Sequence, residues 1–287
     1  MMKGSRGKKT ALSQRESKES FESEAGSSRK TKKSKKEKGR NQPPAHGDVP
    51  LDVNCSLEAK QYESLYIERR KFVWLVKPET EDDIIHRPMY TTGFCMSENG
   101  HIIFSESGIL DEKGATISVR TMDDPTVYKA KIVEKSIKYG FAVLKIDREK
   151  SFDYGVFEDP VQIDIGMNVF GISHDIVVTQ SGPCSYFISN CAPYSFFIGH
   201  VASDCIKKSE IQIYDDEFVD WFKDVDKDTR FFCISGCPRA ESSVGGPVFN
   251  SRGHVIGMIG VPDSGMLYAS VFTDDIQRQI KDILHSK

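Results

Sequence analysis

The chain has 287 residues, of which 38% are hydrophobic and 28% charged, and this is enough apolar material for one large β domain or two small ones. No apolar run reaches about 18 residues, which argues against a membrane-spanning helix, and we expect no membrane association. The formal net charge of −3 averages two unlike parts, because residues 1–50 hold 14 Lys and Arg against 6 Asp and Glu, whereas residues 51–287 hold 25 against 36.

The first 50 residues are rich in Ser, Lys, Glu and Gly and have almost no aliphatic side chains. Such a segment cannot bury enough apolar surface to offset the entropy of ordering it, so we predict a disordered basic tail over 1–50. Its densest basic run includes Lys32, Lys33, Lys35 and Lys36, a pattern typical of nuclear import. Binding of nucleic acid through this tail alone and a purely solubilising role are the alternatives.

No apolar stretch follows the first methionine, so the sequence shows no secretory signal and we expect a nuclear or cytoplasmic protein. Its seven cysteines are odd in number and form no Cys-x-x-Cys motif, which indicates reduced thiols. A zinc site at Cys233 and Cys237 is one interpretation, but small buried core residues are favoured. The seven histidines form no metal-binding motif, and we expect neither a metal nor a cofactor.

From residue 57 the composition changes to that of a folded domain, which we place at 51–287. Tyr62, Leu65 and Tyr66 predict a short helix within 57–70, and 71–76 reads as a first strand. Many short β-type runs bounded by Gly, Pro, Asn and Asp follow, a pattern typical of an all-β sandwich or barrel. The predicted strands are 90–97, 101–105, 115–122, 127–136, 141–147, 168–173, 176–180, 195–201, 230–235, 246–250, 254–261 and 267–272.

Two connections carry hairpin signals. Asn99-Gly100 between two apolar runs predicts a type I′ turn, and Ser251-Arg252-Gly253 predicts a second short turn. Residues 214–228 hold seven acidic residues, with aromatic residues at helical spacing, and predict an amphipathic insertion that packs on the barrel. A dedicated partner-binding helix is the alternative for this segment.

The chain closes with a predicted helix. Thr273 can cap it, and Asp274 and Asp275 stand at the positive end of the helix dipole. Its apolar face is formed by Ile276, Ile280, Ile283 and Leu284.

Three segments resemble the HtrA/Deg family of trypsin-like serine proteases, in the family's order. Residues 93–110, GFCMSENGHIIFSESGIL, are similar to the family's GFVIs-x-dGyIlTNAHVV. Residues 128–133 and 141–146 are similar to its yeAkvv and DlAvLkI, and 244–258, VGGPVFNSRGHVIGM, to its NSGGPlvn-x-xGeviGi. Residues 166–172 match a fourth, weaker pattern. The resemblance implies an all-β fold, a trypsin-like double six-stranded β-barrel with a C-terminal helix.

The resemblance also assigns the catalytic positions. The family's histidine base falls on Ser107, its aspartate on Gly140 and its serine nucleophile on Val244. The serine attacks, the imidazole takes its proton, and the carboxylate orients that imidazole. A valine has no lone pair, a serine is a poor base at neutral pH, and a glycine holds no ring. The alignment therefore predicts a pseudoprotease with no catalytic residue.

Other groups stand near these positions. Ser242, Ser243 and Cys237 lie near the nucleophile position, but strand alternation argues that Ser243 leaves the turn in another direction than Val244. The main-chain N–H groups near Ser242 and Val244 are candidates for a small anion-binding nest like an oxyanion hole.

We therefore expect a catalytically inactive protease homologue that acts as a peptide- or protein-binding module. The substrate cleft of a double barrel recognises extended peptides by adding them to a strand edge, and this needs no nucleophile. The alternative is an active serine-type endopeptidase with a rearranged active site.

Overall fold

A computed structural model describes residues 57–78, 91–105, 117–121, 123–124, 126–148, 151–174, 178–180, 186–188, 194–211, 223–236, 243–263 and 266–285. All of them belong to the compact unit Val49–Lys287. The predicted tail with its lysine run, and most of the predicted insertion at 214–228, lie outside these residues. No helix among the described residues is both long enough and apolar enough to cross a bilayer.

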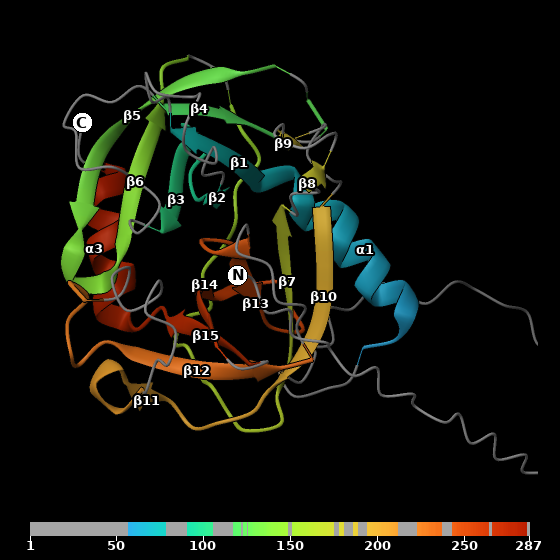
Figure 1. Ribbon diagram of the computed structural model, residues 1–287, viewed down its shortest axis with the longest axis vertical. Helices are drawn as coiled ribbons and strands as arrows, with labels where there is room; N and C mark the ends of the chain where they lie inside the picture. Colours follow the sequence, from blue (N-terminus) through green and yellow to red (C-terminus); the bar gives the residue numbers. More distant parts are fainter. Residues whose placement is uncertain are drawn as a thin grey trace, which may run out of the picture. The chain divides into compact units, whose positions relative to one another are not determined.

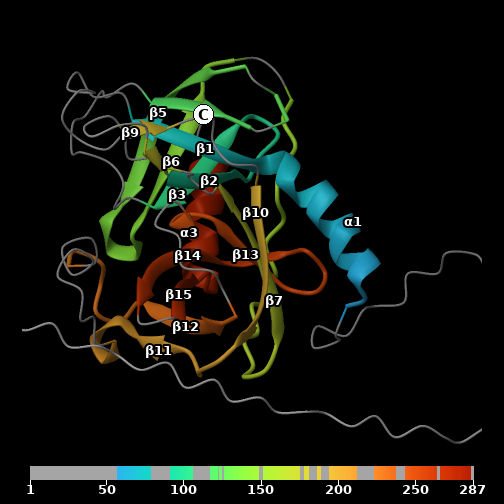
Figure 2. The same cartoon turned by 45° about the vertical axis from the view of Figure 1, so that its right-hand side comes forward.

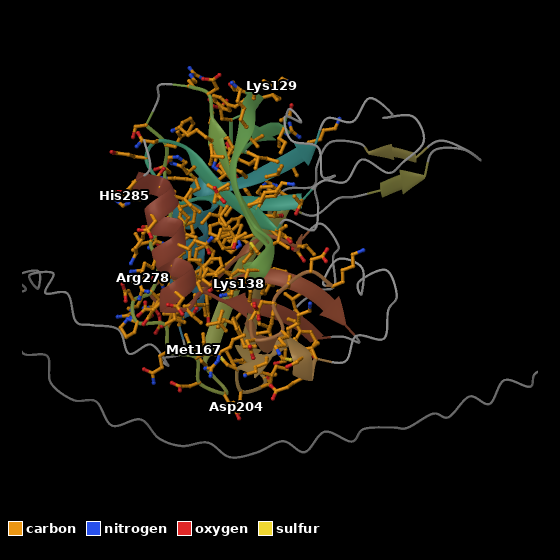
Figure 3. All side chains as sticks on the ribbon, turned by 90° about the vertical axis from the view of Figure 1, so that its left-hand side faces the viewer. Lys129, Lys138, Met167, Asp204, Arg278 and His285 are labelled. Carbon is orange, nitrogen blue, oxygen red and sulfur yellow. The ribbon has the colours of Figure 1, made fainter. Side chains whose placement is uncertain are left out.

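The first barrel is a closed antiparallel sheet in the order β1-β2-β3-β6-β5-β4 (Figure 1). Its strands are β1 (Val73–Pro78), β2 (Thr91–Cys95), β3 (His101–Ser105), β4 (Ile117–Arg120), β5 (Tyr128–Ser136) and β6 (Phe141–Ile146). Figure 3 shows β5 running from Lys129 at the top of the barrel towards Lys138, just beyond its end. The barrel is filled by alternate strand residues such as Ile102, Phe104 and Leu144, which are fully buried.

The second barrel follows the order β10-β7-β13-β14-β15-β12, and β12 pairs with β10 to close it. Its strands are β7 (Asn168–His174), β10 (Tyr194–Val201), β12 (Arg230–Ser235), β13 (Pro247–Phe249), β14 (Val255–Asp263) and β15 (Met266–Val271). A short strand β11 (Ile206–Lys207) extends the sheet beyond β12, and β8 (Val178–Gln180) pairs with β9 (Tyr186–Ile188) in a separate ribbon. The predicted double six-stranded barrel is therefore confirmed.

Within the described residues, two helices pack against the barrels. The helix α1 (Ala59–Arg69) lies along β7 and β10, where Tyr62 makes an edge contact with Phe170 and Tyr66 one with Tyr194 (Figure 2). The spacing of four residues puts both tyrosines on one face of the helix. The C-terminal helix α3 (Asp274–His285), labelled at Arg278 and His285 in Figure 3, confirms the predicted closing helix.

The buried face of α3 agrees with its predicted apolar positions. Ile276 and Ile280 are buried and Ile283 and Leu284 pack at its margin. The polar side chain Gln277 is also buried, and its amide donates to the main-chain oxygens of Glu158 and Phe272.

The buried carboxylate of Glu158 anchors the connection between the barrels to the second barrel. Glu158 is 6% exposed, and its Oε2 accepts hydrogen bonds from Asn250 Nδ2 at 2.7 Å and His254 Nδ1 at 2.8 Å. Its Oε1 forms an ion pair with the Arg252 guanidinium. The carboxylate therefore binds the β13–β14 hairpin, while its main-chain oxygen binds α3.

Two local predictions need correction. Residues 71 and 72 belong to a short 3-10 helix, Arg70–Phe72, and the first strand begins at Val73. The β2–β3 hairpin exists, but its turn is closed by Gly100 N donating to Ser97 O, one residue earlier than a type I′ turn on Asn99-Gly100. Gly100 follows the turn at φ +79°, which is typical of the longer hairpin with a glycine bulge. The predicted turn at 251–253 is present, with Gly253 at φ +75°.

Candidate functional site

The glycine turn before β13 is locked onto β14. Gly246 N donates to Ser243 O at 2.9 Å, which closes the turn. Gly245 N donates to Ile259 O, and Ile259 N donates back to Gly246 O, both at 2.8 Å. Gly245 has φ +85°, and a Cβ atom there would collide with the main-chain oxygen of Thr92. Because the turn approaches the first barrel this closely, only glycine fits this position.

Val244 lies where the glycine turn meets β2 of the first barrel. Its side chain is buried, with 4% exposed. Its main-chain oxygen accepts hydrogen bonds from Thr92 N at 3.1 Å and from Thr91 Oγ1 at 2.7 Å. The start of β2 in the first barrel therefore holds the turn of the second barrel by two hydrogen bonds to one carbonyl.

The structure brings Gly140, a second aligned position, to the same place as the Val244 turn. Ser105, the last residue of β3, pairs with Phe141, and Gly140 directly precedes Phe141. A Cβ atom on Gly245 would lie 3.0 Å from the main-chain nitrogen of Ser105. The Val244 turn and Gly140 therefore both flank the end of β3. Ser107 follows two residues later but lies outside the described residues, as do Ser242 and Cys237.

A side chain at Gly140 would meet Val225. It ends a short 3-10 helix, Ile137–Tyr139, at φ +71°, and a Cβ atom there would stand 2.9 Å from Val225 Cγ2. Lys138 O accepts hydrogen bonds from Asp226 N at 2.8 Å and Thr229 Oγ1 at 3.1 Å, which anchors the segment that carries Val225. The contact between Gly140 and Val225 could not be foreseen, because the periodicity of residues 214–228 indicated only an amphipathic segment.

The two threonines of β2 were also missed by the sequence analysis. Thr91 and Thr92 are both buried, and Thr92 Oγ1 accepts a hydrogen bond from His174 N at 3.0 Å. Nothing in a Thr-Thr pair at the start of a strand distinguishes a site residue from any β-branched strand residue.

One hydroxyl–imidazole pair occurs away from this site. Ser97 Oγ and His101 Nδ1 are 2.7 Å apart in the β2–β3 hairpin. His101 begins β3 and Ser105 ends it, a separation of about 13 Å along an extended strand. Burial, and then the positive charge of Lys145, lower the pKa of His101 to about 4. This pair does not face Val244.

His174 ends β7 and is fully buried beside Tyr194, with 4.9 Å between the ring centroids. Burial, and then the charge of Arg120, lower the pKa of His174 to about 3, so the imidazole is neutral. The carbonyl of Val73 lies beside the ring, but neither ring nitrogen makes a well-formed hydrogen bond within the described residues.

A strand edge opens beside the glycine turn. β13 pairs with β14 only as far as Met258, and Ile259 bonds to the turn itself. Beyond it, in the described part of the chain, β14 pairs with β15 through Pro262 and Asp263. Among the described residues, no strand therefore pairs with the main chain of residues 260–263 on the β13 side.

The described residues contain no group of three or more His, Cys, Asp or Glu side chains placed to hold a metal ion. Cys233 is buried in β12, and its proposed partner Cys237 lies outside the described residues. Zinc binding there stays untested.

Comparison with known proteins yields one family model, the trypsin-like peptidase domain, which matches residues 91–258. A probable periplasmic serine endoprotease, DegP-like, from Rhizobium meliloti (strain 1021) is 27% identical over 200 residues, or 67% of this chain. That match spans only 33% of the relative's length. The crystal structure of Rv3671c protease in an inactive form superposes with a TM-score of 0.55 and 14% identity, covering 80% of this chain and 98% of that one.

Proposed function

Because the chain belongs to the trypsin-like peptidase domain family, we propose that it is a member without peptidase activity that binds extended peptide segments of partner proteins. The observation that carries this proposal is Val244, a buried hydrocarbon side chain directly before Gly245-Gly246-Pro247. Acyl transfer needs an oxygen or sulfur nucleophile at that turn, and a valine supplies none.

The environment of Gly140 supports the same proposal. A carboxylate in this position would have to orient the imidazole of a catalytic base. Gly140 carries no carboxylate, and Val225 Cγ2 would crowd the Cβ atom of any residue that replaced it.

The open edge of β14 supports peptide binding. Residues 260–263 offer main-chain groups beside the Val244 turn, where an added strand would find hydrogen-bond partners. The partner is a peptide or protein segment in extended form, and the fold needs no cofactor for this role.

The absence of catalysis is tested with a fluorophosphonate probe on the purified full-length chain, with trypsin as the positive control. We expect no covalent labelling. Labelling of a defined serine, mapped by peptide mass spectrometry, would overturn the proposal and support the alternative of an endopeptidase with a rearranged active site.

Peptide binding is tested by selecting a phage-displayed library of unstructured peptides on the full-length chain. Selected peptides are then added during amide hydrogen exchange. We expect slower exchange at the amides of Gly260, Val261 and Asp263, with no change in β5 on the first barrel. Selection of no peptide, or protection confined to other strands, contradicts binding at this edge.

The location of the protein is a separate proposal. The run that contains Lys32, Lys33, Lys35 and Lys36 supports nuclear import, and any contact with nucleic acid would use the same tail. A fluorescent fusion of the whole chain should accumulate in the nucleus, and changing these four lysines to glutamine should abolish the accumulation. An unchanged distribution would exclude this run as the signal.

A further inference from the structure

The first barrel carries an open hollow of about 840 Å³ at the end of β5 and β6 remote from Gly140. Lys131 and Val133 of β5 line it, together with Lys145 of β6 and Arg148 just beyond that strand. The two strands run side by side in Figure 1. The hollow is separate from the Val244 turn, because Lys145 lies at the opposite end of β6.

Two lysines face each other directly in this hollow. Lys131 and Lys145 are partners in the β5–β6 register, and His101 is the partner of Lys145 on its other side in β3. Like charges placed opposite each other on neighbouring strands destabilise the sheet. A neutral His101 does nothing to offset the two ammonium groups.

The positive charges of Lys131 and Lys145 are only weakly compensated within the hollow. Lys131 Nζ lies 3.7 Å from Asp147 Oδ2, and both side chains are more than three-quarters exposed. Exposed pairs of this kind contribute little to stability. Lys145 Nζ donates to the neutral main-chain oxygen of Asn99, and the Arg148 guanidinium lies 5.2 Å from the centre of the Tyr128 ring.

The hollow has an excess of positive charge in an acidic domain. Among the described residues, three cations line it, against the two carboxylates of Glu98 and Asp147. Residues 51–287 as a whole have 11 more acidic than basic residues (36 against 25), so this cluster stands out from its surroundings. A local positive potential of this kind concentrates small anions.

An apolar side chain stands among the cations. The β5–β6 register shifts between Ile132 and Glu134, which leaves Val133 as the extra residue of a bulge. Val133 is 45% exposed and lines the hollow. Bulges re-aim side chains, and this one adds an apolar contact beside the ammonium groups.

From these contacts we propose that the hollow binds a phosphate group, held by Lys131, Lys145 and Arg148. A phosphate offers three acceptor oxygens and up to two negative charges, which matches a cluster of separate cations. The phosphate is either free or carried on a phosphorylated side chain, whose adjoining chain would then contact Val133.

The first experiment titrates inorganic phosphate into the full-length chain at constant ionic strength, with sodium chloride replaced stepwise, and follows backbone amides by NMR. We expect saturable shifts in β5, β6 and the β2–β3 turn. Lys131→Gln and Lys145→Gln should each weaken the affinity about three- to fivefold, the magnitude of one exposed charge pair. Lys129→Gln on the same strand is the matched control and should leave the affinity unchanged, because Lys129 points to Ser118.

A second measurement follows the pKa of the His101 imidazole as phosphate is added. A structural effect of the substitutions would not make this pKa respond to phosphate. A bound anion beside Lys145 favours protonated His101, so phosphate should raise its pKa. A phosphoserine peptide is compared with its unphosphorylated form in the same assay. Tighter binding of the phosphopeptide than of inorganic phosphate identifies a phosphorylated chain as the ligand, and equal binding identifies free phosphate.

The proposal is overturned if chloride and phosphate cause the same shifts, or if Lys129→Gln weakens binding as much as Lys145→Gln. A chain that shows no saturable phosphate response overturns it as well. Urea unfolding of each variant checks that the fold is intact, and these exposed or half-exposed lysines should change the midpoint little.

Discussion

The hydroxyl of Thr91 donates a hydrogen bond of 2.7 Å to the main-chain oxygen of Val244, across 153 positions of sequence. Both residues are buried, so neither group can exchange this bond for one with bulk water. The bond joins β2 of the first barrel to the glycine turn before β13 of the second barrel. It makes the geometry of the candidate site depend on the contact between the barrels.

Thr91→Val should destabilise the protein by about 1–2 kcal/mol, because it removes the donor while Val244 O stays buried with Thr92 N as its remaining partner. Urea unfolding followed by far-UV circular dichroism measures this. Thr126→Val, at an exposed threonine, is the control and should change stability by less than about 0.5 kcal/mol. Equal effects of the two variants would show that the Thr91 bond contributes nothing.

Gly140→Ala should destabilise the protein by about 1–3 kcal/mol, since φ is +71° and Val225 Cγ2 stands where the new methyl group would go. The variant Val225→Ala makes room, so the double variant should recover part of the loss. A double-mutant cycle of unfolding free energies measures the coupling. Strict additivity of the two changes would rule out a direct contact.

Val244→Ser alone should not create a hydrolase. The new hydroxyl would lack an imidazole to take its proton, and the members of a triad act as a unit. Fluorophosphonate labelling and a casein digestion assay would check this, with Val244→Ala as the control for the altered packing. Measurable turnover by the serine variant but not by the alanine variant would mean that a base already faces the turn.

The sequence predicts more of the fold than of the candidate site. The strands 101–105 and 230–235 and the closing helix were predicted to the residue or nearly so, because short apolar runs between turn residues and an acidic first helical turn are local signals. The turn at Gly100 was misplaced by one residue, since Asn-Gly also fits a longer hairpin. The contacts of Thr91 with Val244 and of Val225 with Gly140 depend on long-range packing, and no local pattern encodes them.

Acid should destabilise the protein through His174. Its pKa is about 3 in the folded chain and 6.5 in the reference state, so the unfolded chain binds a proton more readily. The free energy of unfolding therefore falls as the pH drops below 6.5 towards the folded value. His174→Phe keeps a ring against Tyr194, and it should lose less stability between about pH 7 and pH 5 than the parent chain. Urea midpoints at the two pH values measure the difference, and equal losses would contradict the assignment.

Glu158→Gln should cost about 1–3 kcal/mol, because the partly exposed Arg252 guanidinium loses its counter-charge and the amide cannot accept every hydrogen bond of the buried carboxylate. Thermal unfolding measures the loss. Glu63→Gln on the exposed face of α1 is the control and should leave the midpoint unchanged. A stable Glu158→Gln variant would mean that the hairpin and α3 hold without this charge.

The packing of Val225 against Gly140 has an evolutionary consequence. If the proposed function holds, a descendant that gained an aspartate at position 140 would first lose stability, and it would gain no hydrolysis without a base and a nucleophile as well. Shrinking Val225 in advance would open a void with no immediate benefit. Under the proposed function, either order of change at positions 140 and 225 would therefore lower stability before any hydrolysis could be gained.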